Sequence, residues 1–270
     1  MASRAACDGD KRMGFDARAA ARYIADAHRA RAAFQNLPDG IGPTTLAEAY
    51  EAQEALHPLL AARYGTAAGV KIATTTKVMQ TLMGIDRPSF GVIFADRIHS
   101  SPARLHLGEF ISLKIECELA VRLGHSLPPR AAPYTGETVA AAVEAIMPAF
   151  ELVDDRMANY NDTSALSLIA DNCWNAGVVL GRGLPYAPGF ELNGLAGSLT
   201  INGRGQHHGR TDDPLGAVAW VANMAAERGR ALRKGHIIMT GSLIPTLPIG
   251  GGDRFSLAIG SLGVVELSVD

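Results

Sequence analysis

The chain has 270 residues, of which 47% are hydrophobic and 19% charged, and its formal net charge is −2. This near-neutral balance gives no electrostatic reason to expect nucleic acid or a membrane surface as a partner. The length allows a sizeable core, so stability should need neither disulfides nor a structural metal. Three widely spaced cysteines, Cys7, Cys117 and Cys173, fit neither a disulfide framework nor a zinc site and indicate a reducing cytoplasm.

Helices are expected mainly in the first third of the chain. Residues 1–13 lack both periodicity and the apolar segment of a signal peptide, and we expect a loose leader there. No apolar run is long enough to span a bilayer. Thr45 and Glu48 have the spacing of a capping box, which predicts a helix start. The predicted helices cover 16–35, 45–64, 75–83, 137–147 and 213–228.

Short strands are expected over most of the remaining chain. Alternation of apolar and polar residues predicts a strand over 115–121, and Asn202-Gly203 predicts a tight hairpin turn. The other predicted strands cover 69–73, 90–94, 146–153, 177–180, 199–201, 237–240, 255–259 and 264–269. Helices that precede a mostly β region indicate an α+β fold.

Three glutamates carry the strongest functional signal. Glu116 and Glu118 point to one face of their predicted strand, and Glu151 interrupts the apolar run 146–153. Adjacent carboxylates repel, and a buried charge needs a counter-charge or a metal. Oxygen ligands suit Mg²⁺ or Mn²⁺, so the pattern indicates a metal site. The alternatives are a charged outer strand face for Glu116 and Glu118 and an exposed strand end for Glu151.

Other polar residues leave two interpretations open. Lys71, in an apolar strand, is either an edge charge or a site cation that binds a carboxylate or relays protons. Asp171 and Asn172 belong either to the site or to a backbone turn, and the turn is favoured. Residues 154–156 either form a local ion pair that supports Glu151 or lie in a solvated turn, and the turn is again favoured. No His-Glu-x-x-His, P-loop, dinucleotide or nucleophile-elbow motif occurs.

Several motifs, in the right order, resemble those of a known family. They are Gly69-Val-Lys-Ile, Ile115-Glu-Cys-Glu-Leu-Ala, Pro148-Ala-Phe-Glu-Leu-Val-Asp, Ala170-Asp-Asn and Gly235-His-Ile-Ile-Met-Thr-Gly-Ser. From about Leu46 onward the chain resembles the 2-keto-4-pentenoate hydratase / 2-oxo-hept-3-ene-1,7-dioate hydratase family. That family lies within the fumarylacetoacetate-hydrolase-like superfamily, which includes 4-oxalocrotonate decarboxylases.

The resemblance implies a fold, a metal and an assembly. It implies a helical N-terminal part over 1–68 and a fumarylacetoacetase-like catalytic domain over 69–270, which is β-rich, mixed and β-roll-like. It also implies Mg²⁺ or Mn²⁺ and a homo-oligomer. The family's metal ligands fall on Glu116, Glu118 and Glu151, and its active-site lysine falls on Lys71.

The chain departs from the family pattern at a few positions. Many hydratases have an acid where Ser89 stands, a glycine where Ala73 stands, and small residues where Cys173 and Trp174 stand. The expected site residues besides the metal ligands are Lys71 and Asp171 for catalysis, and Ser89, Trp174 and Ser242 for substrate binding. Arg87, Arg97 and Arg122 could each bind a second substrate carboxylate, but we expect them at the surface.

The expected reaction is metal-assisted hydration of a 2-hydroxy-2,4-dienoate to a 4-hydroxy-2-oxo acid, in the catabolism of aromatic compounds. The first alternative is decarboxylation of a 2-oxo-3-enedioate of the 4-oxalocrotonate type. Ser89 favours it, because decarboxylation needs no base to activate water. C–C hydrolysis of an acylpyruvate and a non-catalytic subunit of an active homologue are further alternatives. Expected partners are the small-molecule substrate, copies of the chain, and a pathway aldolase or decarboxylase.

Overall fold

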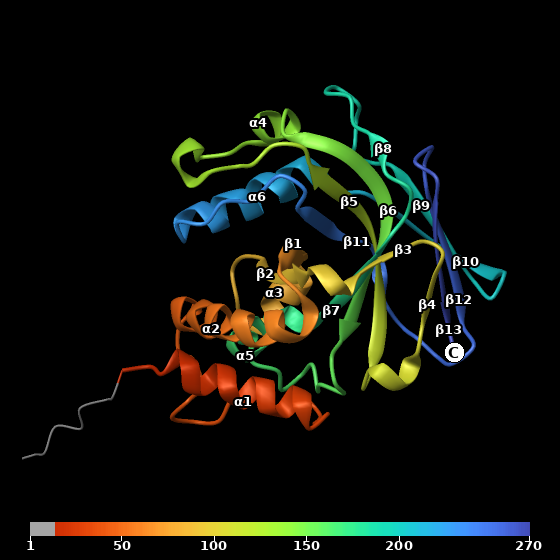
Figure 1. Ribbon diagram of the computed structural model, residues 1–270. Coiled ribbons are helices and arrows are strands. Elements are labelled where there is room, and N and C mark those ends of the chain that lie inside the picture. The colour runs from red at the N-terminus through yellow and green to blue at the C-terminus, as the bar shows by residue number, and fades with distance from the viewer. Residues whose placement is uncertain (1–13) are drawn as a thin grey trace, which may run out of the picture.

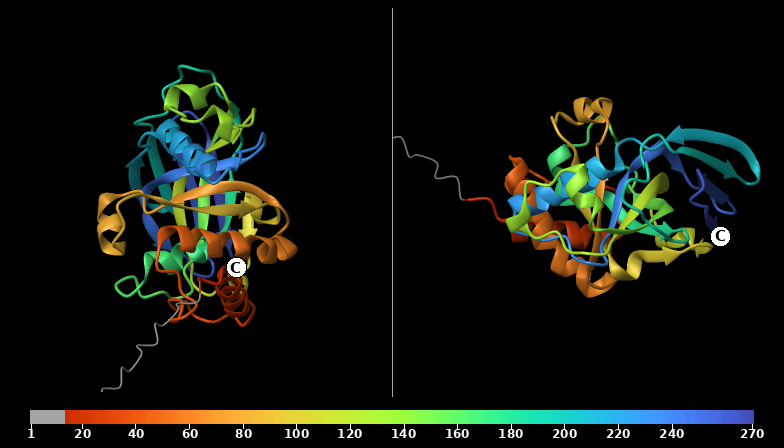
Figure 2. Two further views of the ribbon diagram at one scale, coloured as in Figure 1. Left: turned by 90° about the vertical axis from the view of Figure 1, so that its left-hand side faces the viewer. Right: turned by 90° about the horizontal axis from the view of Figure 1, so that it is seen from above.

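The computed structural model describes residues 14–270, and the leader expected over 1–13 lies outside these described residues. Helices gather on one side of the molecule and two mixed sheets on the other, which confirms the α+β fold (Figure 1). In the view turned about the vertical axis, helices lie in front of the strands (Figure 2). Across residues 14–270, no helix combines the length and apolar character needed to cross a membrane.

The described residues form six α-helices and two sheets. The helices are α1 (Ala17–Arg29), α2 (Leu46–Tyr64), α3 (Lys77–Met83), α4 (Gly136–Ala140), α5 (Ala165–Ala170) and α6 (Pro214–Glu227). Sheet A has the order β2-β1-β11-β5-β6-β7-β3, with β8 paired to β6, and sheet B has the order β10-β9-β12-β13-β4. The strands of sheet A are β1 (Ala67–Ala73), β2 (Ser89–Phe94), β3 (Ile98–Ser100), β5 (Leu113–Leu123), β6 (Val143–Asp154), β7 (Asn175–Leu180), β8 (Leu184–Pro185) and β11 (Ile237–Pro248). The strands of sheet B are β4 (Ala103–Leu105), β9 (Ala196–Ile201), β10 (Arg204–Arg210), β12 (Arg254–Ile259) and β13 (Val264–Val269).

Local sequence signals set several boundaries as expected. Thr45 caps α2, and the Glu48 side chain accepts from the Thr45 N–H, which completes the capping box. Asp213 caps α6 by accepting from the backbone N–H of Gly216. The turn Asn202-Gly203 joins β9 to β10 with positive φ at both residues, as a type I′ hairpin requires.

One predicted helix is wrong over most of its length. A helix was predicted over 137–147, but α4 ends at Ala140 and β6 begins at Val143. β6 pairs with β5 in a long antiparallel ladder, and this tertiary pairing overrides the helix propensity of alanine. The short helix α5 was not predicted.

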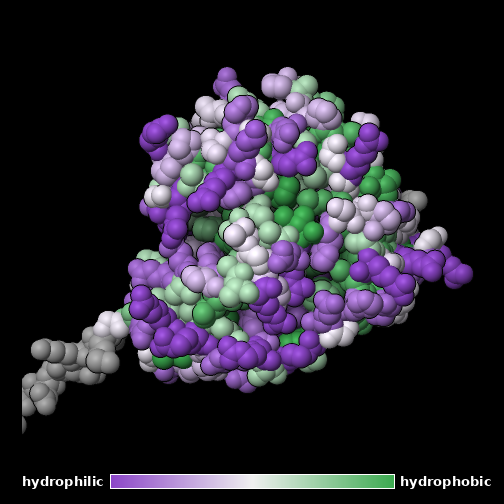
Figure 3. Space-filling view, in the orientation of Figure 1, coloured by the Kyte–Doolittle hydropathy of each residue, from purple (hydrophilic) through white to green (hydrophobic). Residues whose placement is uncertain are grey.

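Sheet B and the N-terminal helices cover different parts of sheet A. The face of β6 that points away from Glu151 packs on sheet B, where the rings of Phe150 and Phe255 lie 6.4 Å apart. Helices α1 and α2 pack on β2 through Val92 and Phe94. In the space-filling view, hydrophilic residues dominate the periphery and apolar residues gather near the middle (Figure 3).

Curvature of sheet A brings distant strands together. Strands β1 and β6 are three places apart in the sheet order, which corresponds to roughly 14 Å in a flat sheet. Lys71 Nζ of β1 nevertheless lies 2.8 Å from Oε1 of Glu151 on β6. The bend of sheet A, which is evident in the arching of β6 in Figure 1, and the long lysine side chain close this distance.

Side-chain amides close the free edge of β2. Gln53 Nε2 donates to the Phe90 carbonyl, and the Asn172 amide both accepts from and donates to the backbone of Val92. These bonds hold the turn Asn172–Trp174, in which all three residues have positive φ, against the strand. The edge is therefore protected from pairing with another strand.

Gly91→Ala tests the close approach of this turn to β2. A Cβ at Gly91 would lie 2.4 Å from the backbone oxygen of Asn172, so the turn or the strand must move. We expect a loss of about 3 kcal/mol in the free energy of unfolding, measured by urea denaturation at fixed protein concentration. Gly108→Ala is the control, because nothing lies within 4 Å of a Cβ there. Equal stability of the two variants would contradict the close packing.

Candidate metal centre

Three glutamate side chains meet on the concave face of sheet A. Glu116 and Glu118 share a face of β5, and Glu151 of β6 pairs directly with Glu116 in the ladder. One ligand oxygen from each side chain lies within 4.8 Å of the others. Glu118 and Glu151 are fully buried, and Glu116 is partly buried. A solvated outer face for Glu118 and an exposed strand end for Glu151 are therefore both wrong.

Hydrogen bonds satisfy only part of this carboxylate cluster. Glu118 Oε2 accepts from the backbone N–H of Gly241 at 2.8 Å, and Glu116 Oε1 accepts from the Thr246 hydroxyl at 2.6 Å. In the described part of the chain, the buried atoms Glu118 Oε1 and Glu151 Oε2 have no hydrogen-bond partner. Buried oxygens without a donor are unfavourable unless a cation binds them. The three carboxylates thus fit a hard divalent cation.

Lys71 supplies a positive charge beside the cluster. Its ammonium pairs with Glu151 Oε1, which also accepts from Asn175 Nδ2 at 3.2 Å. Burial alone would lower the pKa of Lys71, but Glu151 and Glu116 raise it above its ordinary value. The Lys71 side chain is only 3% exposed, so Lys71 is a buried cation and the edge-charge interpretation is wrong.

Burial raises the pKa of both buried glutamates. The pKa of Glu118 lies well above its usual range, because the charges of Glu151 and Glu116 add to the effect of burial. The pKa of Glu151 is raised to about 7 by burial, although Lys71 opposes the rise. Without a cation, the cluster therefore retains protons at pH values where exposed carboxylates are ionised.

We expect metal affinity to rise with pH up to about 7, because a divalent cation must displace protons from Glu118 and Glu151. If one proton leaves per metal, affinity should increase about tenfold per pH unit below the raised pKa. The metal-free protein should show the opposite trend in stability. Its folded state binds more protons than the unfolded state, so the free energy of unfolding falls between pH 4.5 and about 7.

Calorimetric titration with Mn²⁺ at several pH values, together with urea denaturation of the metal-free protein, checks both trends. Equal metal affinity at acidic and neutral pH would contradict proton displacement from these side chains.

Two predicted substrate-binding residues already have protein partners. The Ser89 hydroxyl, at the start of β2, lies 3.1 Å from Thr74 Oγ1. The Ser242 hydroxyl, opposite Glu118 in the ladder, accepts from the Cys117 N–H and donates to the Ile244 carbonyl at 2.6 Å. Ser242 therefore stabilises an irregular part of β11 beside the glutamates. A substrate-binding role for Ser89 and Ser242 stays a prediction.

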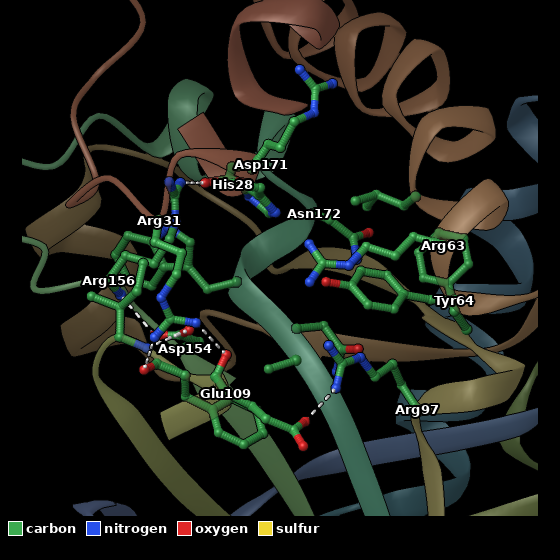
Figure 4. Close-up of a pocket in the computed structure, with 18 residues that line it drawn as sticks. His28, Arg31, Arg63, Tyr64, Arg97, Glu109, Asp154, Arg156, Asp171 and Asn172 are labelled. Carbon is green, nitrogen blue, oxygen red and sulfur yellow. Dashed lines mark hydrogen bonds and ion pairs between the residues drawn. The ribbon is translucent and has the colours of Figure 1, made fainter. Parts of the chain in front are cut away.

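Asp171 and Trp174 line a second cavity, with a volume of about 170 Å³, to which neither Lys71 nor the three glutamates contribute (Figure 4). Asp171 Oδ1 lies 2.6 Å from His28 Nε2, and Oδ2 pairs with Arg156. Burial alone would raise the pKa of Asp171, but His28 and Arg156 hold it below its ordinary value. The catalytic role of Asp171 and the substrate contact of Trp174 stay predictions.

The turn Asn172–Trp174 stands between this cavity and Lys71. Asn172 and Trp174 line the cavity, whereas Cys173 Sγ lies 3.6 Å from Ser89 Oγ on β2. Asp171 and Asn172 do lie at a turn, but the expectation that their side chains tie their own backbone there is wrong, because Asp171 pairs with His28 and Arg156 and Asn172 bonds to Val92.

The solvated turn expected over residues 154–156 is wrong. Asp155 is fully buried, and Arg156 is buried against Asp171. Lys114 Nζ pairs with Asp155, and the Tyr160 hydroxyl donates to the same carboxylate at 3.0 Å. The solvated interpretation failed because Lys114 and Asp171, which pair with Asp155 and Arg156, come from other elements that the local sequence does not place nearby.

Sequence reasoning also missed Asn175, Gly241 and Thr246 as hydrogen-bond donors to the glutamates. Asn175 lies three residues after the motif Ala170-Asp-Asn, and this proximity was the only signal in the sequence for its role. Gly241 and Thr246 lie on β11, whose register with β5 shifts more than once, so counting residues could not place them.

A buried cluster of three carboxylates with a lysine ion pair, on a curved mixed sheet, defines a protein with a candidate divalent-metal centre. The chain belongs to the fumarylacetoacetate (FAA) hydrolase C-terminal family, whose sequence model matches residues 70–270. The family to which the sequence motifs pointed is thereby confirmed.

Related proteins cover most of this chain. It is 32% identical over 254 residues to the TodF product hydratase of Pseudomonas putida, covering 92% of this chain and 93% of that protein. It is 33% identical over 202 residues to 2-keto-4-pentenoate hydratase 1 of Dechloromonas aromatica, covering 73% and 76%. Among solved structures, 4-oxalocrotonate decarboxylase from Pseudomonas putida G7, complexed with magnesium and adipate, superposes with a TM-score of 0.85. That match has 25% identity and covers 94% of this chain and 97% of the other.

Proposed function

We propose that this protein is a metal-dependent hydratase that adds water to a 2-hydroxy-2,4-dienoate and forms a 4-hydroxy-2-oxo acid in the catabolism of aromatic compounds. The observation that carries the proposal is the buried cluster of Glu116, Glu118 and Glu151 beside Lys71. Relatives named as hydratases, one of which matches over 92% of this chain, support this reaction over others on the same fold.

The proposed centre binds a 2-oxo acid through opposite charges. Glu116, Glu118 and Glu151 would hold Mg²⁺ or Mn²⁺, which when bound supplies a Lewis acid for the C2 oxygen and a template for the C1 carboxylate. Lys71 remains protonated at neutral pH because its pKa is raised, so it can donate a hydrogen bond to an anionic oxygen of the substrate. It therefore stabilises charge and is not the base that activates water.

Hydration requires two proton movements. The dienol loses its proton from the C2 oxygen and gains one at C5, which gives a conjugated enone. Water then adds its oxygen to C4 and a proton to C3, so the substrate gains one H₂O in total. The chain has a hydroxyl at Ser89, which lies 3.1 Å from Thr74 Oγ1, so we propose that these hydroxyls relay the protons through water.

A decarboxylase of a 2-oxo-3-enedioate is the second candidate. It would use the same carboxylates, but it would cleave the bond to a carboxylate and protonate the resulting dienolate. Two observations favour it, namely the absence of an acid at Ser89 and the similarity to 4-oxalocrotonate decarboxylase over 94% of the chain. Decarboxylation needs no activated water, so a neutral Ser89 is sufficient.

Two further alternatives have less support. Acylpyruvate hydrolysis requires a histidine–carboxylate pair beside the metal, yet in residues 14–270 no histidine is hydrogen-bonded to the three glutamates. A non-catalytic subunit would not need a buried triad with unsatisfied oxygens. Homo-oligomer formation, a cytoplasmic location and association with a pathway aldolase or decarboxylase stay predictions.

The decisive experiment gives the purified protein Mg²⁺ and either a 2-hydroxy-2,4-dienoate or a 2-oxo-3-enedioate, and identifies the products by mass spectrometry. A gain of one water by the first substrate supports the hydratase. Release of carbon dioxide from the second, without hydration of the first, would assign the decarboxylase. A parallel Mg²⁺ titration is needed, because a chain that binds no metal would be incompatible with both reactions.

A further inference from the structure

The second cavity has an excess of positive charge that the proposed reaction does not use. It is lined by five arginines and three acids, an excess of two positive charges in a chain whose net charge is −2. Arg156 is neutralised by Asp171, and Arg29 by Asp26. Asp154 accepts from the backbone N–H groups of Ile111 and Ser112. Three guanidinium groups, those of Arg31, Arg63 and Arg97, then face two carboxylates, Glu109 and Asp154, so one positive charge remains in excess.

The contacts of these three arginines fix their positions but leave their charges largely uncompensated. Arg31 donates to the backbone carbonyls of Glu109 and Phe110, which are neutral acceptors. Arg97 forms an ion pair with Glu109 at 3.7 Å, which is longer than a hydrogen bond and compensates part of its charge (Figure 4). Arg63 and Arg97 pack on the ring of Tyr64, at 5.0 and 4.1 Å from its centroid. Arg31 and Arg63 form no ion pair with a carboxylate within residues 14–270.

The cavity combines these cations with apolar walls. In Figure 4, Arg31 lies on one side and Arg63, Tyr64 and Arg97 lie on the other. Leu60 and Phe110 also line the cavity and contribute apolar surface. The volume of 170 Å³ is roughly ten times the ~15 Å³ that one water requires, so an organic molecule of a few carbons fits. The wall also contains Trp174, whose buried indole N–H has no partner among the described residues.

We propose that this cavity is a second binding site, separate from the carboxylate centre, for a short organic dicarboxylate. A guanidinium carries five N–H donors, so Arg31 retains three beyond its two backbone bonds, and cations on opposite sides suit an acid with a carboxylate at each end. The apolar walls favour a carbon chain between the carboxylates over a compact inorganic anion. The site does not depend on the reaction proposed above, because no residue of the carboxylate centre lines it.

The test is a calorimetric titration with glutarate at low salt, on protein freed of divalent metal with a chelating resin. Removing the metal takes away the group that would hold a carboxylate at the carboxylate centre, so glutarate binding to the metal-free protein is assigned to the cavity. We expect one glutarate per chain. The variants Arg63→Gln and Arg97→Gln should each weaken binding about tenfold, the value of one lost charge-assisted hydrogen bond.

The matched control is Arg130→Gln, an exposed arginine outside the cavity, which should bind glutarate like the wild type. Inorganic phosphate, titrated separately, should bind more weakly than glutarate. Raising the salt concentration should weaken binding in the wild type, which tests the electrostatic origin without any substitution. The proposal is overturned if glutarate does not bind, if both cavity variants bind it normally, or if phosphate binds more tightly than glutarate.

Discussion

Glu118→Gln is expected to weaken both activity and divalent-metal binding strongly while leaving the fold intact. The substitution preserves the shape of the side chain, and the amide oxygen can still accept from the Gly241 N–H. It removes a ligand charge from the centre, so we expect metal affinity to fall about a hundredfold and turnover about a thousandfold. Titration with Mn²⁺ and the product assay measure the two losses.

The stability of the metal-free variant separates a ligand role from a structural one. In the metal-free protein, burial and then repulsion from Glu151 and Glu116 raise the pKa of Glu118, so an uncharged side chain at this position should maintain or increase stability. Glu266→Gln, at an exposed position on β13, is the control and should change neither metal binding nor activity. Normal metal binding by Glu118→Gln would remove Glu118 from the centre, and a large loss of metal-free stability would assign it a structural role.

Lys71→Met should lower turnover by about a thousandfold, the upper end of the loss seen when one hydrogen-bond donor to a developing negative charge is removed. Methionine fills similar space but cannot donate to a substrate oxygen. In the wild type, the Lys71 ammonium lies 2.8 Å from Glu151 and opposes the rise in the pKa of that carboxyl group. Loss of the ammonium should therefore raise the pKa of Glu151 further. The pH dependence of metal binding should therefore move above pH 7 in the variant.

The pH dependence of metal binding distinguishes Lys71 from a residue that merely supports the fold. Lys234→Met, at an exposed lysine, is the control and should retain both the turnover and the pH profile of the wild type. An unchanged pH profile for Lys71→Met would contradict the ion pair with Glu151, and full turnover would exclude Lys71 from the reaction.

Surface exposure was expected for Arg87, Arg97 and Arg122, and the structure confirms it for two of the three. Arg87 and Arg122 have side chains that are 54% and 42% exposed, as expected for surface residues. Arg97 is only 18% exposed, because Tyr64 of α2 and Glu109 approach it from distant parts of the chain. The expectation for Arg97 was therefore wrong, and it bears on the second cavity.

Short-range signals in the sequence determined much of the fold. The cap at Thr45, the cap at Asp213 and the hairpin turn at Asn202-Gly203 all occur as predicted, because each depends on the backbone of three or four neighbouring residues. The pairing of Glu116 and Glu118 on one face follows from the two-residue repeat of a strand. The division between residues 68 and 69 stays a prediction.

Only the tertiary structure decided how these elements meet. The strand that replaced the helix over 143–147 forms because β5 offers a pairing partner. The ion pair of Lys71 with Glu151 requires the curvature of sheet A, and the left-handed turn Asn172–Trp174 requires the edge of β2. Such contacts depend on the sum of many packing interactions between segments far apart in sequence. No local pattern encodes that sum, so the sequence could name the carboxylates and the lysine but could not bring them together.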